Sequence, residues 1–366
     1  MTALIADLEL DDRLVTAPAG LPLFVHRAGK LRRVPFSLRD FLFTDLVPWT
    51  GKLRVLLEPL TAGARADERV ADYFVRKLGR ELYENLAGPL YGGLYASDPA
   101  DMVVGLSLGH VLAEFGIGRS LVVPLLRRGG RVAPPAACSF VDGLETIPRA
   151  LHARNRENVR TGVEVRAVGP ERRGWTVETS AGTLEAEHVV VTAPAPAAAR
   201  ILEAGGVAAG NLNALTYNPL AVVHLHSVAS LRGLGYQVGL GENLVTRGVT
   251  FNDSLFERRG VYTAYLGGAK RRDAMEWTDE VLGETAVREF SKVTGADATV
   301  LHVAREWMPA WDASWVALQE TPRLPGLHFA TNWQSRPGIP GRLAQASRLA
   351  ASLAASLANR TTPDIA

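Results

Sequence analysis

The sequence is poor in cysteine, in long apolar runs and in charge of one sign, and each shortage excludes a class of protein. Its single cysteine, Cys138, excludes an internal disulfide and any metal site built on several cysteines, and it fits a reducing cytoplasm. No stretch of about 20 uncharged apolar residues occurs, so we expect no transmembrane helix. The first dozen residues carry four carboxylates and no basic region, so we expect no signal peptide.

The charge balance also argues against a highly charged partner such as a nucleic acid. The 366 residues include 40 Lys and Arg against 38 Asp and Glu, a formal net charge of +2, which argues against nucleic-acid binding. His224 and His226 share one face of an expected strand, but no further ligand cluster accompanies them, so we expect no metal. We find no nucleophile and base at a convincing spacing, and we therefore assign no catalytic side chain.

A glycine-rich phosphate cradle is also missing from the N-terminus. Residues 2-TALIADLELDDRLV-15 favour a helix and its exit. A dinucleotide-binding unit would instead open with a strand, a G-x-G-x-x-G turn and a helix. The chain therefore starts without the first unit of such a fold.

The pattern along the chain predicts a mixed α/β protein of two domains' length. Residues 21–36 read as a hairpin around Ala28-Gly29, and 38–130 read as mostly helical. Within it, a helix is expected over 67–90, capped by Asp67 and stopped at Gly88-Pro89. Another helix is expected over 278–295, between the caps Thr278 and Gly295.

Strands are expected in the second half of the chain. The run Val189-Val190-Val191 is short and β-branched, which predicts a strand buried on both faces of a central sheet. A helix is expected over 342–358 and a frayed tail over 359–366. The expected strands cover 163–170, 174–182, 188–194, 220–228, 246–254, 261–269, 299–306 and 326–331.

Several segments resemble one known family. The specific ones are Gly92-Gly93-x-Tyr95-Ala96-x-Asp98-Pro99 and Phe140-x-x-Gly143-Leu144-x-Thr146-x-Pro148, followed by 326-GLHFATNW…GIP-340. Together they resemble the protoporphyrinogen and coproporphyrinogen oxidases of the flavin-containing amine oxidase superfamily, over residues 1 to about 355. The resemblance implies a two-dinucleotide-binding-domain flavoprotein fold that lacks its N-terminal βαβ unit.

The resemblance also implies how the chain is divided. We expect a substrate domain over 1–37 and 211–320. Residues 38–130 would form an inserted helical domain. Whether its apolar face contacts a bilayer stays open. The FAD-binding domain would be discontinuous, over 131–210 and 321–358.

The resemblance places non-covalent FAD against a few positions. The backbone of Val165 would pair with the adenine edge, while Ala193 and Pro194 end a strand where the chain approaches the cofactor. Pro337, Gly338 and Ile339 precede a helix whose N–H groups would face the flavin, and Asn332 belongs to the same C-terminal motif. This chain departs from relatives at Thr331, usually Gly, at Gly341-Arg342, usually Asp-Cys, and at Ala346, often Ser or Gly.

The substrate face follows from the same resemblance. Leu234, Tyr236 and Tyr265 fall where relatives line a tetrapyrrole cavity. A macrocycle needs flat apolar walls and a few cations for its propionates. Pro22-Leu23 stands where some relatives place a basic residue, so Arg27 or Arg32 would have to replace it, unless both are exposed hairpin charges.

The function implied is oxidation of a porphyrinogen to the porphyrin in heme biosynthesis, with FAD as cofactor and oxygen as electron acceptor. Two alternatives stay open: a truncated non-catalytic homologue, such as a porphyrin-binding or relic fragment, and another amine-oxidase-type flavoenzyme. We expect a cytoplasmic protein and no nucleic-acid partner. Peripheral membrane contact and a homodimer both stay open.

Overall fold

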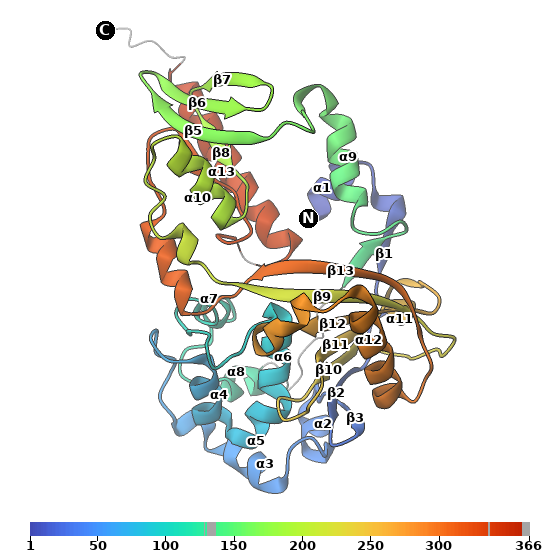
Figure 1. Ribbon diagram of the computed structural model, residues 1–366. Helices are drawn as coiled ribbons and strands as arrows, with labels where there is room; N and C mark the ends of the chain where they lie inside the picture. The colour runs from blue at the N-terminus through green and yellow to red at the C-terminus, as the bar shows by residue number, and fades with distance from the viewer. Residues whose placement is uncertain (128, 130–136, 336, 361–366) are drawn as a thin grey trace. The chain divides into compact units, whose positions relative to one another are not determined.

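The computed structural model describes residues 1–127, 129, 137–335 and 337–360 (Figure 1). The predicted tail beyond residue 360 and the start of the predicted 131–210 segment lie outside these residues. The chain divides into two compact units. Unit 1 combines Met1–Arg13, Asp142–Leu215 and Ser314–Ala366, and unit 2 combines Leu14–Val141 and Thr216–Ala313. Within the described residues, no helix has both the length and the hydropathy needed to cross a membrane.

Unit 2 is built on a seven-stranded mixed sheet in the order β13-β9-β12-β11-β10-β2-β3. All neighbours are antiparallel except β10 and β2, which run parallel. The predicted hairpin is confirmed as β2 and β3, with Ala28 and Gly29 both at positive φ in the turn. Strands β1 and β4 form a separate two-stranded antiparallel sheet. The strands of unit 2 are β1 (Leu14–Thr16), β2 (Leu23–Arg27), β3 (Lys30–Arg33), β4 (Cys138–Phe140), β9 (Tyr217–His226), β10 (Gly235–Val238), β11 (Thr246–Phe251), β12 (Val261–Gly267) and β13 (Thr299–Pro309).

One face of this sheet is covered by helix α12 (Asp279–Thr294). Leu282, Ala286 and Phe290 of the helix are fully buried in one apolar cluster with every second residue of the strands, including Val223 and Tyr262. The Thr278 side chain caps the helix by accepting from the Val281 N–H, and Gly295 ends it in the left-handed conformation. The predicted helix and both of its caps are therefore confirmed.

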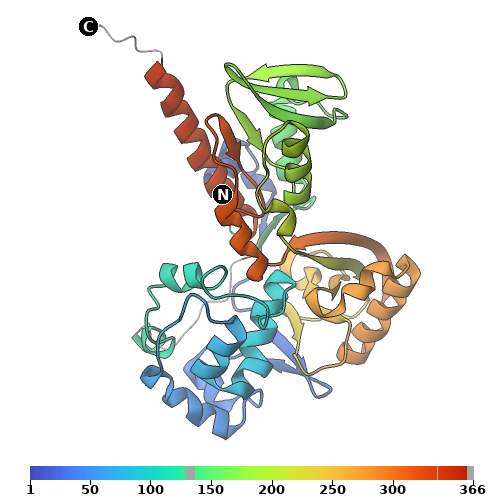
Figure 2. The same cartoon turned by 60° about the vertical axis from the view of Figure 1, so that its left-hand side comes forward.

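The other face carries the helical part of unit 2, with α3 to α6 clustered beside β2 and β10 (Figures 1 and 2). Val25 of β2 packs there with Leu46, Val47 and Leu82. The helices of unit 2 other than α12 are α2 (Leu38–Phe43), α3 (Trp49–Leu56), η2 (Glu58–Leu60), α4 (Val70–Leu78), α5 (Arg80–Leu82), the π-helix η3 (Tyr83–Ala87), α6 (Gly88–Tyr95), α7 (Gly109–Glu114), α8 (Val122–Arg127), α11 (Asn252–Phe256) and η6 (Ala269–Glu276).

The single helix predicted over 67–90 is wrong. The helix begins at Val70 behind Arg69, and it is interrupted at Gly79, whose φ of 91° no α-helix accommodates. A π-helical turn then precedes α6, so that Pro89 stands in the first turn of a new α-helix. Proline is tolerated there because that N–H has no partner within the helix, and the chain continues helical to Tyr95.

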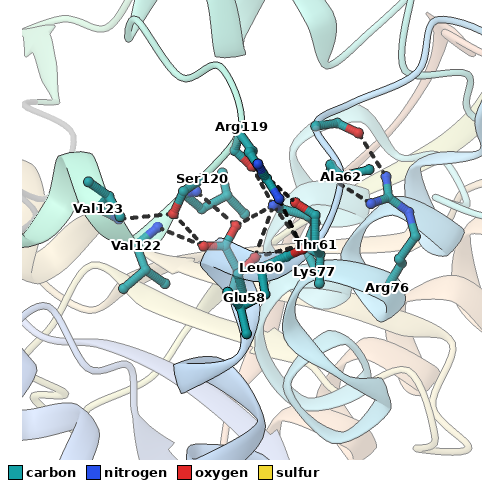
Figure 3. Close-up of polar contacts among 12 residues, drawn as sticks. Glu58, Leu60, Thr61, Ala62, Arg76, Lys77, Arg119, Ser120, Val122 and Val123 are labelled. Atoms are coloured by element: carbon teal, nitrogen blue, oxygen red, sulfur yellow. Dashed lines mark hydrogen bonds and ion pairs between the residues drawn. The ribbon is translucent and has the colours of Figure 1, made fainter.

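A buried ion pair ties α8 to the helices beside it (Figure 3). The Lys77 Nζ lies 2.6 Å from the Glu58 carboxylate, and both side chains are fully buried. Lys77 also donates to the Thr61 hydroxyl and to the Arg119 carbonyl oxygen. Glu58 accepts from Ser120 and from the backbone N–H groups of Leu121 and Val122, at the start of α8. Every polar atom of the pair is therefore partnered, which a buried pair requires.

The same contacts set the ionisation of Glu58. Burial alone would raise the pKa of this carboxyl, but the hydrogen bonds from Lys77, Ser120 and the Leu121 N–H hold it below its usual range. A carboxyl whose pKa is lower in the folded state stabilises the fold at pH values above its unfolded-state pKa. That contribution is lost as the pH falls through the lower, folded-state pKa.

Unit 1 contains a two-stranded parallel sheet, β8 with β14, and a three-stranded antiparallel sheet in the order β5-β6-β7. Helix α10 packs against β5, and the indole N–H of buried Trp175 donates to the Pro325 carbonyl oxygen at 3.0 Å. The elements of unit 1 are α1 (Thr2–Asp7), η1 (Asp11–Arg13), α9 (Thr146–Arg154), η4 (Arg156–Asn158), β5 (Val165–Glu171), β6 (Gly174–Thr179), β7 (Gly182–Ala186), β8 (Val189–Val191), α10 (Ala195–Ala204), η5 (Leu212–Ala214), η7 (Ala313–Glu320, whose first residue belongs to unit 2), β14 (Leu327–Phe329) and α13 (Ile339–Arg360).

The expectation that Val189–Val191 would be buried on both faces is wrong for this structure. Only Val191 is buried, and Val190 is 39% exposed. Among the described residues, β8 has one neighbour, β14, so one of its edges is unpaired. Burial on both faces requires covering layers, which the local sequence alone cannot specify.

We predict that Lys77→Met will lower the free energy of unfolding by about 3–5 kcal/mol, because it leaves the Glu58 carboxylate buried without a cation. Urea unfolding followed by circular dichroism of the full chain measures this. Arg80→Met is the matched control, since Arg80 pairs with Glu84 on the exposed surface one turn away, and we expect it to cost less than about 1 kcal/mol. A Lys77→Met protein within 1 kcal/mol of wild type contradicts the prediction.

Candidate functional site

Each unit has its own cavity beside residues that the sequence singled out. The first, in unit 1, lies where the parallel strands β8 and β14 end. We call it the strand-end cavity. Its volume is about 370 Å³, and it is lined by Thr192, Pro194, Ala330, Thr331, Asn332, Arg342, Leu343, Gln345 and Ala346. In sheets of parallel strands, ligands bind in the crevice at the carboxyl ends of the strands.

The Trp333 side chain connects two turns that contribute to the walls of the strand-end cavity. This side chain is fully buried, and its indole N–H donates to the Ala193 carbonyl oxygen at 3.0 Å. The bond joins the turn after β8 to the turn after β14. Ala193 therefore holds the wall in place, while its neighbour Pro194 faces the cavity.

Two features suit this cavity to a polar, anionic group. The Thr331 hydroxyl is buried without a hydrogen-bond partner among the described residues, although Thr331 lines the cavity. Helix α13 begins at Ile339, after Gly338 at a φ of 87°, and its first turn carries Arg342. A helix N-terminus favours negative charge, and a guanidinium pairs well with phosphate. These residues fit a phosphate-bearing cofactor.

The predicted cofactor residues are only partly brought together. Pro194 and Asn332 line the strand-end cavity, and Pro337, Gly338 and Ile339 lead into the helix whose first turns form one wall. Val165 does not line it: this residue lies on β5, paired with Thr179 of β6. The role assigned to its backbone stays a prediction.

The second cavity, in unit 2, lies on the face of the seven-stranded sheet that α12 does not cover. We call it the sheet-face cavity. It measures about 260 Å³ and is lined by Gly93, Leu94, Ala96, Leu220, Gln237, Arg247, Gly248, Tyr265 and Met308. Gln237, Gly248 and Tyr265 are direct register partners on three adjacent strands, so their side-chain positions share one face.

The Gly92-Gly93 pair brings α6 close to this sheet. A methyl group at Gly93 would lie 2.2 Å from the Gln237 amide oxygen, and one at Gly248 would lie 2.8 Å from the same atom. A methyl group at Gly92 would instead lie 2.8 Å from the Ser97 carbonyl oxygen. The two helical glycines therefore have different roles. Gly93 leaves space for the Gln237 amide, and Gly92 leaves space for the backbone that follows the helix.

Only one of the three predicted substrate residues lines the sheet-face cavity. Tyr265 lines the sheet-face cavity, but Tyr236 is buried in the opposite face, where its ring packs against Phe251. Burial there also raises the pKa of the Tyr236 hydroxyl. Leu234 is half-buried and is not part of the lining. Because side chains alternate along a strand, the cavity receives Gln237, the next residue after Tyr236.

The cation of the sheet-face cavity is Arg247, which the sequence did not single out. Arg32 bonds Asp45, and Arg27 donates to the Leu46 carbonyl oxygen, so both act within the hairpin and its neighbours. The signal for Arg247 was its place inside the apolar strand 246-TRGVTF-251, where a charge is unusual. Among the described residues, no three His, Cys, Asp or Glu side chains gather closely enough to hold a metal.

Comparisons with known proteins identify the family of the chain. Residues 1–354 match the family model described as flavin containing amine oxidoreductase, so the chain belongs to that family. It is 28% identical over 335 residues to the chloroplastic protoporphyrinogen oxidase of Nicotiana tabacum, covering 80% of this chain and 61% of that protein. It is 27% identical over 302 residues to the Homo sapiens protoporphyrinogen oxidase, covering 73% and 63%. The chain thus spans about three fifths of the length of these curated relatives.

Solved structures agree on the fold. A crystal structure of an Exiguobacterium sp. 255-15 protein, provisionally named a protoporphyrinogen oxidase, matches with a TM-score of 0.78. That match covers 96% of this chain and 84% of the other, at 22% identity. A variant of putrescine oxidase matches with a TM-score of 0.67 at 14% identity, covering 97% and 85%. The mixed α/β fold is therefore that of the flavin-dependent amine oxidases over nearly the whole chain.

We predict that Gly92→Ala will destabilise the protein by about 1–3 kcal/mol, because the new methyl group meets backbone that cannot yield. Gly93→Ala should cost less, since the three nearest atoms all belong to the flexible Gln237 amide. Urea unfolding measures both, and Gly241→Ala, in open space, is the control. Equal stabilities for Gly92→Ala and wild type would show that α6 does not depend on this close approach.

Proposed function

We propose that this protein is an FAD-dependent oxidoreductase that converts a porphyrinogen, protoporphyrinogen IX or coproporphyrinogen III, to the porphyrin, with oxygen as the electron acceptor. The observation that carries the proposal is which segments of the chain form the walls of the sheet-face cavity. Its walls include Gly93 and Ala96, from the segment in which the chain resembles the porphyrinogen oxidases, and Tyr265. The membership of the chain in the flavin-containing family supports the cofactor.

The strand-end cavity is the proposed flavin site. Thr331 would offer its unpartnered hydroxyl, the first turn of α13 would offer its N–H groups, and Arg342 would offer a cation. When bound, a flavin supplies the hydride-accepting chemistry. In the sheet-face cavity, Leu94, Leu220 and Met308 would exclude water and position an apolar ring.

The two alternatives differ from this proposal in what they bind. A non-catalytic homologue would retain no flavin, whether it binds a porphyrin or is a relic fragment that binds none. Another amine-oxidase-type enzyme would retain flavin and form no porphyrin from either porphyrinogen. Flavin retention and porphyrin formation, measured on the same preparation, therefore separate all three.

We predict that the purified chain, incubated with FAD and desalted, will keep a flavin absorption spectrum. Ala346→Phe should reduce the retained flavin at least tenfold, because the ring would fill the strand-end cavity. Ala344→Phe is the matched control: Ala344 is exposed on the same helix and does not line the cavity. Equal flavin retention by the two variants would exclude this cavity as the site.

We also propose that unit 2 contacts a membrane surface peripherally. Six exposed apolar side chains line one further cavity of about 400 Å³ and form what we call the α2–α3 patch: Leu38, Leu42, Trp49, Leu53, Leu56 and Leu126. Trp49 is 65% exposed, and Lys52 lies 4.5 Å from its ring centre. Large exposed apolar side chains gathered on one surface suit the interfacial region of a bilayer.

We predict that Trp49→Ser combined with Leu56→Ser will weaken binding to vesicles of 70% phosphatidylcholine and 30% phosphatidylglycerol at least tenfold. Each lost apolar side chain removes area that would enter the bilayer. Co-sedimentation measures the bound fraction. Trp307→Ser is the control, because Trp307 is similarly exposed but lies on β13. Wild-type protein that does not sediment with these vesicles contradicts the membrane proposal.

A further inference from the structure

Arg247 is a cation that has no anionic partner among the described residues. Its side chain is half-buried in the wall of the sheet-face cavity, and it makes no hydrogen bond or ion pair with any part of the chain that the structure describes. Burial lowers the pKa of its guanidinium, which is the sign of a poorly solvated charge. A charge removed from water is costly unless it is paired, so its place here calls for a partner.

The backbone directs this side chain into the cavity. Thr246 is paired with Leu266, and Gly248 with Tyr265, so Arg247 is the extra residue of a β-bulge between two consecutive pairs. In a regular strand, Arg247 would share a face with Val249, which is buried in the cluster beneath α12. The bulge instead turns Arg247 toward the same side as Gly248. Bulges are frequent where a strand re-aims a side chain beside a site.

Two carboxylates, Asp98 and Glu289, act electrostatically on Arg247, but both are bonded to other groups. Asp98 pairs with Lys270 at 3.3 Å and accepts from the Ala100 N–H at 3.0 Å. Glu289 accepts from the backbone N–H groups of Val245 and Thr246, at 3.0 and 2.8 Å, from the α12 side of the sheet. Neither carboxylate bonds the guanidinium, so Arg247 is left available to an anion from outside the described chain.

Gln237 adds a neutral donor to the same wall. Its amide has no hydrogen-bond partner among the described residues, and Gly93 and Gly248 leave space for it. The remaining lining is largely apolar, from Leu94, Leu220 and Met308. A guanidinium with an adjacent amide, set in apolar walls, is suited to a carboxylate attached to a hydrophobic body.

We propose that Arg247, assisted by Gln237, binds a carboxylate of the substrate and so fixes which edge of the ligand enters the sheet-face cavity. This inference rests on the proposed function and narrows it: the preferred ligand is a tetrapyrrole whose entering edge carries a propionate. The cavity volume of about 260 Å³ is below the range of about 300–1,000 Å³ typical of whole-ligand pockets. It therefore accommodates one edge of a macrocycle.

The test compares one macrocycle with and without its charges. The full chain, incubated with FAD, is titrated with coproporphyrin III and with its tetramethyl ester in the same detergent, and Kd is measured from tryptophan fluorescence. We expect Arg247→Leu to weaken binding of the free acid at least tenfold and binding of the ester by less than twofold. Arg247→Lys, which keeps the charge, should lie between. Arg33→Leu, on an exposed position of the same sheet, should match wild type.

The outcomes distinguish failure of this inference about Arg247 from failure of the proposed function. If wild type binds acid and ester equally and Arg247→Leu changes neither, the role of Arg247 is refuted and the porphyrinogen proposal stands. Equal weakening of acid and ester by Arg247→Leu also refutes it, because the effect is then structural. Wild type that binds neither compound overturns the proposed function and this inference together. If Arg247→Leu does not fold, Arg247→Gln, which keeps polar atoms in the cavity, carries the same comparison.

Discussion

The close approach of helix α6 to the seven-stranded sheet is the constraint on which the sheet-face cavity depends. Gly88, Gly92 and Gly93 occupy the positions of α6 where a methyl group would meet Leu240, the Ser97 carbonyl oxygen or the Gln237 amide. Glycine costs a helix up to about 1 kcal/mol per position relative to alanine. Three such positions in an eight-residue helix are tolerated because tertiary packing replaces the lost helix propensity, and at Gly93 the close approach leaves room for the Gln237 side chain in the cavity wall.

A second constraint is that a strand has only two faces. Val249 and Phe251 must meet α12, so regular alternation would bury Arg247 with them. One extra residue in β11 resolves this conflict: the strand keeps its apolar residues in the core and still presents a cation to the other side. The Glu289 carboxylate accepts the Val245 and Thr246 N–H groups just before the bulge, and thereby satisfies backbone donors where the ladder is disturbed.

Local signals explain which parts of the fold could be predicted from the sequence. The Ala28-Gly29 hairpin and the Thr278 and Gly295 caps depend on residues adjacent in sequence, and all are present in the structure. The break at Gly79, the π-helical turn before Pro89 and the exposure of Val190 depend on what packs against them, and these were missed. Tyr236 and Gln237 differ by one position, so a sequence without register information cannot choose between them. Arg247 stands out as a charge inside an apolar strand, but the face it occupies is set by a bulge whose register depends on the neighbouring strand.

The two kinds of wall in the sheet-face cavity act on different properties of a ligand. Apolar contacts from Leu94, Leu220 and Met308 depend on buried area, and a macrocycle turned about its own axis would bury nearly the same area in each orientation. A guanidinium that recognises a carboxylate depends on direction, because its donors form a planar fork. Under the proposed function, the apolar walls would therefore govern whether a macrocycle binds, whereas Arg247 would govern which of its edges enters. Selection among porphyrinogens by the propionate on the entering edge would then depend on Arg247 of β11 and on the adjacent Gln237 of β10.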